Sequence, residues 1–101
     1  MISEAFVRRC IQENDMDVCK AIVAVYRRQT ASEQKCEHTT ETNGVGFSKF
    51  DAEFLTSLAK QIILNKQLGR DTLLSPKQIS RGRKAVLKYS KQVARIINGE
   101  I

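Results

Sequence analysis

Cysteine and histidine are the side chains of this chain that could hold a metal ion or supply a nucleophile with its base. Cys36 and His38 flank Glu37, and further thiols stand at Cys10 and Cys19. The cysteine spacings fit none of the common zinc patterns, and the first two thiols belong to expected helices. A Cys36–His38 pair in a polar loop also lacks an orienting group and a sheltered site. We therefore expect free thiols, no metal, no cofactor and no enzymatic activity.

Two other short patterns resemble ligand-binding motifs but are incomplete. The run 14–17, Asn-Asp-Met-Asp, lacks the glycine and the terminal glutamate of a calcium loop. Gly44 and Gly46 lack the third glycine and the preceding strand of a dinucleotide fingerprint. Both patterns therefore indicate connections between elements.

The strongest chemical signal is a basic segment, 75–98, that contains no Asp or Glu. The rest of the chain contains the other 10 of its 17 basic residues and all 11 of its acidic ones, so the excess positive charge lies in this segment. On a helix that advances about 100° per residue, all of its cations except Arg83 fall within about 40° of one line. These cations are Lys77, Arg81, Arg83, Lys84, Lys88, Lys91 and Arg95.

The spacing of these cations favours a polyanionic partner. Like charges at i, i+4 destabilise a helix, whereas Glu and Lys at that spacing stabilise it, so a merely solvated face usually mixes the two signs. We predict that the seven residues contact the backbone of nucleic acid, DNA more than RNA, with little base preference.

Three alternatives stay open. The basic segment could be a solvated surface, or it could dock on an acidic surface of a helicase, polymerase or host regulator. The opposite, apolar side of the same helix could also pair with a second copy to form a homodimer. The residues expected on that pairing side are Ile79, Val86, Val93 and Ile97.

Length and composition bound the class of protein. The chain has 101 residues, a formal net charge of +6 and 42% hydrophobic residues, which suits one small soluble domain. Its apolar runs are far shorter than the roughly 20 residues that a membrane span requires. Its first residues lack a basic region followed by an apolar one. We expect a cytoplasmic protein, in the host cytoplasm if it is encoded by a phage.

The first third of the chain has the pattern of two helices. Ser3 is the expected N-cap of the first helix, which ends before Asn14 and buries Phe6 and Cys10. Asp15 or Asp17 is expected to cap the second helix. The apolar positions of that helix fit i, i+3, i+4, i+7 spacing and are Val18, Ala21, Ile22 and Val25.

A polar stretch, 32–47, separates these helices from two more. Ser48 is expected to start a helix through Leu68 that Gly69 ends, and the run 75–78, Ser-Pro-Lys-Gln, starts a last helix through Asn98. Gly82 in the last helix invites close packing or a slight bend. We expect the rings of the chain's phenylalanines and of Tyr89 to serve the core.

The sequence thus predicts an all-α fold with four helices arranged as two helical hairpins. The N-terminal hairpin covers 1–31, a polar loop or linker covers 32–47, and the C-terminal hairpin covers 48–99. Together they form a single small domain, 1–101.

The C-terminal 55 residues or so also resemble a known helical module. The resemblance lies in 43–61, which contains Gly-Phe-Ser-Lys-Phe-Asp, in 74–78, Leu-Ser-Pro-Lys-Gln, and in 83–92, Arg-Lys-Ala-Val-Leu-Lys-Tyr-Ser-Lys-Gln. That module is associated with replication and repair proteins of phages and mobile elements, including small products linked to the recombination helicase of T-even phages. The resemblance implies an accessory role near DNA and transfers no catalytic residue.

Overall fold

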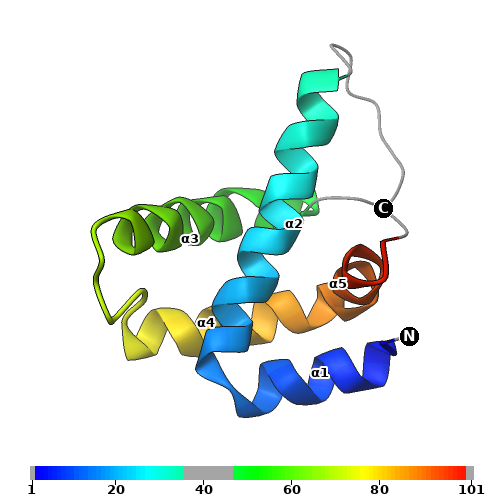
Figure 1. Ribbon diagram of the computed structural model, residues 1–101, viewed down its shortest axis with the longest axis horizontal. Helices are drawn as coiled ribbons and strands as arrows, with labels where there is room; N and C mark the ends of the chain where they lie inside the picture. The colour runs from blue at the N-terminus through cyan, green and yellow to red at the C-terminus, as the bar shows by residue number, and fades with distance from the viewer. Residues whose placement is uncertain (1, 36–46, 100–101) are drawn as a thin grey trace.

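The computed structural model describes residues 2–35 and 47–99, and within these ranges it contains helices and no strand (Figure 1). The predicted all-α fold is confirmed, with the fourth helix divided by a short turn. In chain order the elements are α1 (Glu4–Glu13), α2 (Asp15–Lys35), α3 (Lys49–Gln67), α4 (Pro76–Val86), a 3₁₀ turn (Leu87–Tyr89) and α5 (Ser90–Ile97).

A single residue, Asn14, joins α1 to α2. Ser3 caps α1 as predicted, because its Oγ accepts a hydrogen bond from the Phe6 N–H at 3.1 Å. At the other end Asn14 has an extended backbone, and its N–H donates to the Cys10 carbonyl at 2.9 Å. Its Oδ1 accepts from the Met16 N–H at 2.9 Å, so Asn14 also caps α2. The prediction that Asp15 or Asp17 would cap this helix was wrong.

The buried side of α1 differs from the predicted one. Val7 and Ile11 are buried, whereas Phe6 is 53% exposed and Cys10 is only half-buried. The two faces differ by one position, or about 100° of helix rotation. The branched aliphatic side chains are the ones that face α2 and α5, the two helices on which α1 packs.

The core is centred on α2, which packs against α3 and α4 as well as α1. The predicted apolar face of α2 is confirmed, since Val18, Ala21, Ile22 and Val25 are all buried. The helix continues to Lys35, so the predicted start of the loop at residue 32 was wrong. The rest of that loop up to residue 46, with Cys36 and His38, lies outside the described residues.

The third helix, α3, buries Leu55, Leu58 and Ile62, but Phe50 is 92% exposed. The expectation that this ring serves the core was therefore wrong. Phe50 lies in the first turn of α3, where the neighbouring Asp51 is the side chain that contacts the 3₁₀ turn, through Lys88 and Tyr89.

The end of α3 follows the prediction. Gly69 adopts a φ of +71°, which is in the left-handed region that favours glycine. Its N–H donates to the Lys66 carbonyl at 3.1 Å, and the Arg70 N–H donates to the Asn65 carbonyl at 3.0 Å. This is the pattern of a Schellman motif, and it turns the chain toward α4.

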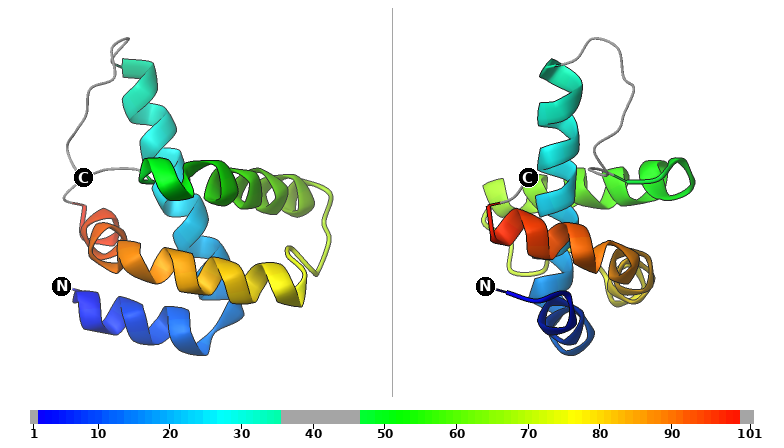
Figure 2. Two further views of the ribbon diagram at one scale, coloured as in Figure 1. Left: turned by 180° about the vertical axis from the view of Figure 1, so that it is seen from behind. Right: turned by 90° about the vertical axis from the view of Figure 1, so that its right-hand side faces the viewer.

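The two ends of the described chain lie side by side (Figure 2). The Ile2 N–H donates to Asn98 Oδ1 at 2.9 Å, and Asn98 Nδ2 donates to the Ile2 carbonyl at 2.9 Å. This reciprocal pair closes α1 onto α5, so the N-terminal and C-terminal helix pairs share one core.

Candidate nucleic-acid interface

The start of α4 is fixed by the capping box that the sequence predicts. Ser75 Oγ accepts from the Gln78 N–H at 3.2 Å, and Gln78 Oε1 accepts from the Ser75 N–H at 2.9 Å. The Gln78 amide also exchanges two hydrogen bonds with the Gln61 amide on α3, at 2.9 and 3.0 Å. The first turn of α4 is therefore held to α3 in a defined rotation about its axis.

Gly82 lets α4 approach the core closely. A Cβ atom at this position would lie 3.2 Å from a methyl carbon of Ile22 and 3.2 Å from one of Leu58. With Gly82, α4 buries Ile79 and Val86 on the same side. The predicted close packing at this glycine is thus confirmed.

Three cations of α4 lie on the side of the helix opposite to Ile79, Gly82 and Val86. Lys77, Arg81 and Lys84 are exposed, and among the residues that the structure describes none of them has a carboxylate partner. On an ideal helix the three fall within about 60° of one another. We call these three residues the α4 basic face.

The predicted cationic line does not continue straight into α5. The chain forms a 3₁₀ turn over Leu87–Tyr89, where Ser90, fully buried, donates its hydroxyl to the Leu87 carbonyl at 2.7 Å. Each 3₁₀ residue advances about 120° instead of 100°, so three of them shift later side chains by roughly 60°. The axis also changes direction, since α4 runs across the page in Figure 1 whereas the end of α5 is seen nearly end-on.

Arg83, one of the predicted contact residues, is occupied inside the fold. Its Nε donates to the Ile11 carbonyl at 2.9 Å, and its Nη2 forms an ion pair with Asp15 Oδ1. Through these contacts one guanidinium joins α4 to the corner between α1 and α2. Arg83 therefore does not belong to the nucleic-acid interface, and its placement there is corrected.

Lys88 is neutralised by a carboxylate from α3. Its Nζ lies 2.9 Å from Asp51 Oδ2, and the Asp51 side chain is only 14% exposed. The hydrogen bond from Lys88 is the largest cause that holds the pKa of Asp51 below its ordinary value. The same bond raises the pKa of Lys88. The Lys88 side chain is still 60% exposed, so its predicted contact with nucleic acid stays a prediction, but a phosphate would have to compete with Asp51 for its ammonium group.

Tyr89 completes this arrangement, whereas the sequence analysis predicted only that its ring serves the core. Its hydroxyl donates to Asp51 Oδ2 at 2.8 Å and accepts from the Ser48 N–H at 2.9 Å. Its ring meets Phe47 edge-on, with centroids 5.5 Å apart. The hydroxyl thus takes the place of a side-chain cap at the start of α3, where Ser48 itself makes no side-chain cap.

The last two predicted contact residues lie on α5. Lys91 is exposed, whereas Arg95 is half-buried and takes part in an interaction within the fold. Both lie beyond the 3₁₀ turn, on a helix whose axis runs in a different direction from that of α4. Of the seven predicted contact residues, Lys77, Arg81 and Lys84 form one continuous face.

The apolar side of this segment is used within the chain. Ile79, Val86 and Val93 are buried in the core, and Ile97 is the one of the four residues expected on the pairing side that stays about half exposed. The homodimer that would pair all four residues with a second copy is therefore excluded, because three of them have no surface to offer.

The predicted thiols fall on different helices. Cys10 is half-buried on α1, and Cys19 is buried on α2, where burial is the largest cause that raises the pKa of its thiol. Within 2–35 and 47–99 no three side chains of the His, Cys, Asp and Glu types come together as metal ligands. No helix in those same ranges is long and apolar enough to cross a membrane.

Comparison of the chain with family models, with curated proteins and with solved structures finds no match. The resemblance to the helical module of phage replication proteins therefore stays a prediction from its motifs.

Proposed function

We propose that this protein is a non-enzymatic accessory protein that binds the sugar-phosphate backbone of nucleic acid through the α4 basic face. The observation that carries the proposal is the exposure of Lys77, Arg81 and Lys84 on one side of a helix whose other side is locked into the core. The sequence resemblance to a phage replication and repair module points in the same direction and favours DNA.

The size of this face sets the scale of the interaction. From Lys77 to Lys84 the helix rises by about 10 Å, since each residue adds about 1.5 Å. Phosphates along one strand follow each other at about 3.4 Å of helix rise, so the face can follow roughly three of them. Three phosphate contacts correspond to a slope of log K against log salt near −3 for duplex DNA and near −2 for single strands.

Backbone contact also explains why little base preference is expected. Lysine and arginine side chains spread along a whole helix face contact phosphates, whereas base readout concentrates polar side chains at the helix end that enters a groove. Tyr89, the ring nearest this face in sequence, is buried.

The proposal is tested by reversing the charge of the face with Lys77→Glu, Arg81→Glu and Lys84→Glu together. We expect the Kd for a labelled duplex at low salt to rise at least tenfold, and the salt slope to fall by about 3. Fluorescence anisotropy on duplex DNA, single-stranded DNA and RNA of equal length measures both quantities and ranks the three nucleic acids.

A second triple variant with the same change in net charge distinguishes an effect of the α4 basic face from an effect of net charge. Arg9, Arg28 and Lys60 are exposed cations on other helices, and reversing them lowers the formal net charge from +6 to zero, as the first triple does. The proposal fails if the two triples weaken binding equally, or if the parent protein binds none of the three nucleic acids. In the second case an acidic protein surface becomes the better partner for α4.

A further inference from the structure

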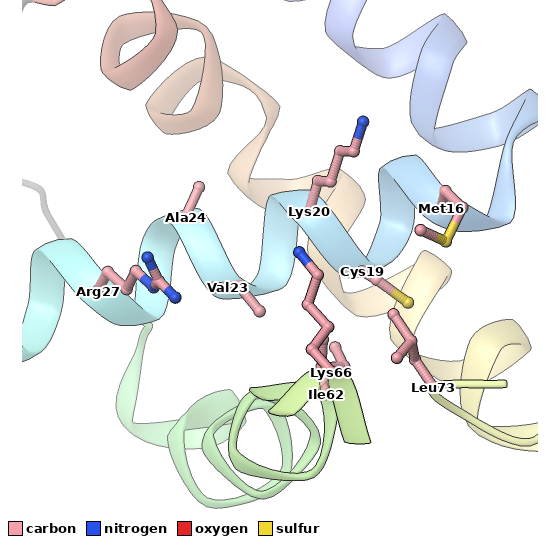
Figure 3. A pocket seen from close by; sticks show the side chains of 9 residues that line it. All are labelled: Met16, Cys19, Lys20, Val23, Ala24, Arg27, Ile62, Lys66 and Leu73. Carbon is pink, nitrogen blue, oxygen red and sulfur yellow. The ribbon is translucent and has the colours of Figure 1, made fainter. Parts of the chain in front are cut away.

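The outer side of α2, opposite to α4, carries a hollow whose floor is apolar (Figure 3). Its volume is about 220 Å³, and side chains of α2, of α3 and of the connection between α3 and α4 line it. Val23, Ile62 and Leu73 are among the apolar lining residues, and the protonated thiol of Cys19 lies beside them. The hollow therefore offers apolar side chains beside α2 and α3.

Cations surround this floor. Lys20 and Arg27 extend from α2 and Lys66 extends from α3, whereas the lining contains no carboxylate. Lys20 and Lys66 are exposed, and no ion-pair partner for either occurs among the described residues. Asp15, a nearby carboxylate that acts on Cys19, is already paired with Arg83. The charged side chains that line this hollow are therefore all cationic, and Arg27 among them already takes part in another interaction.

A second hollow adjoins the first across α2. Its volume is about 290 Å³, and it lies between α2, α1 and α5. Its lining includes Phe6 and Ile97, each about half exposed, and one carboxylate, that of Asp17 on α2. Lys20 and Ala24 line both hollows, so the small side chain of Ala24 forms a low ridge between them.

The size and lining of the first hollow indicate what it can hold. Sites for nucleotides and other small ligands usually enclose about 300 Å³ or more, so a hollow of about 220 Å³ suits a single large apolar side chain. Its lining contains no aromatic ring on which a base could stack. An apolar side chain flanked by carboxylates would match both its floor and its cations.

We propose that an acidic amphipathic helix of a partner protein docks across α2, placing one apolar side chain in each hollow and carboxylates against Lys20 and Lys66. Such a helix presents apolar side chains at i, i+3, i+4 and i+7, which is the spacing that two adjacent hollows require. The low ridge at Ala24 lets the backbone of the incoming helix cross α2.

A second copy of this chain is a poorer occupant. In a symmetric pair this surface would face a second copy of itself, and its cations outnumber Asp17, the one carboxylate in the lining of the two hollows, so the two copies would repel each other. The buried side of α4 packs against α2 at Gly82, and the α4 basic face is on the opposite side of α4, so docking of an acidic helix would leave it open to nucleic acid.

The test begins with a displayed library of random peptides of about 18 residues, long enough to form a helix on binding. The library is selected against the intact protein. We expect the selected peptides to be rich in Asp and Glu, with large apolar residues at helical spacing. Selection of neutral or basic peptides, or no enrichment at all, would overturn the proposal.

Variants then locate the site by fluorescence polarisation with the selected peptides. We expect Lys20→Glu with Lys66→Glu, and separately Ala24→Glu, to weaken binding at least tenfold. Lys49→Glu with Lys60→Glu matches the charge change of the lysine pair, and Ser57→Glu matches that of Ala24→Glu; all three control positions are exposed on α3 outside both hollows. Melting followed by circular dichroism identifies any variant that fails to fold, and the exposed lysine pair still decides the question if Ala24→Glu does not fold.

Two further outcomes would assign the surface to a different occupant. If the parent protein sediments as a dimer that Ala24→Glu dissociates, the occupant is a second copy. If Ala24→Glu weakens duplex binding as much as the α4 triple reversal does, the occupant is nucleic acid. The α4 triple variant should bind the peptides as tightly as the parent, so failure of one proposal can be told from failure of the other.

Discussion

Two groups of cations in the same basic segment have different roles in the fold. Lys77, Arg81 and Lys84 on α4 face solvent, whereas Arg83 and Lys88 reach carboxylates on α2 and α3. All five lie within 12 residues of one basic sequence. They differ in the direction in which the helix points each side chain and in whether a carboxylate from another helix lies within reach. The comparison teaches that the number of basic residues in a segment overstates how many cations are free to bind a polyanion.

Substituting one residue from each group should give the largest difference in the free energy of unfolding. Arg83→Met removes a charge-assisted hydrogen bond and leaves the Ile11 carbonyl without it, so we expect a loss of about 2–3 kcal/mol in the free energy of unfolding. Lys84→Met at an exposed position should stay within about 0.5 kcal/mol. Urea denaturation followed by circular dichroism measures both.

Nucleic-acid binding should show the opposite order for the same two variants. Lys84→Met should weaken binding, whereas folded Arg83→Met should bind almost as the parent does. If Arg83→Met weakened binding more than Lys84→Met while remaining folded, the separation of the two groups would be wrong.

Removal of the Tyr89 hydroxyl should have an intermediate effect. Tyr89→Phe keeps the ring against Phe47 but leaves the Ser48 N–H without its acceptor, so we expect a loss of about 1–2 kcal/mol in unfolding free energy. Hydrogen exchange should rise first in the N-terminal turn of α3, and NMR detects this directly. Unchanged exchange there would mean that the hydroxyl does not cap the helix.

The smallest effect concerns the Asp51–Lys88 pair and depends on pH. Because the folded pKa of Asp51 is lowered, its contribution to stability is present above about pH 4 and is lost as the pH falls through the folded pKa. Lys88, with a raised pKa, keeps its own contribution until the pH rises through its folded value, above its ordinary pKa of 10.5.

Asp51→Asn should therefore lower the melting temperature slightly near neutral pH, and the difference from the parent should shrink toward pH 2–3. Glu53→Gln, at an exposed position two residues along α3, serves as the control. A difference from the parent that stays constant down to pH 2 would show that the charge of Asp51 contributes nothing.

The parts of the fold that sequence could predict depend on contacts within one helical turn. The capping box at Ser75 and the left-handed glycine at Gly69 each involve groups only a few residues apart, so their patterns are visible in the chain itself. The apolar spacing of α2 is similarly complete within one element. These local patterns therefore predicted where the helices lie and which face of α2 is buried.

The parts that sequence could not predict depend on distant partners. Ser48 resembles a capping residue, yet its N–H is satisfied by Tyr89, 41 positions away. Phe6 is more hydrophobic than Val7 by size, but the position of α1 between α2 and α5 buries Val7. The turn at Ser90 also depends on burial of a small hydroxyl, for which the sequence carries no distinct pattern.

The hydrogen-bonded pair between Ile2 and Asn98 spans 96 positions and so bears on how fast the molecule folds. Closing a loop between two such distant points costs about 4 kcal/mol in chain entropy, which the contact itself must offset. Most other helix contacts can form across shorter loops, so the docking of α1 on α5 belongs to the late part of folding. A short peptide linker joining the two ends would remove most of that cost, and would speed folding without altering any side chain.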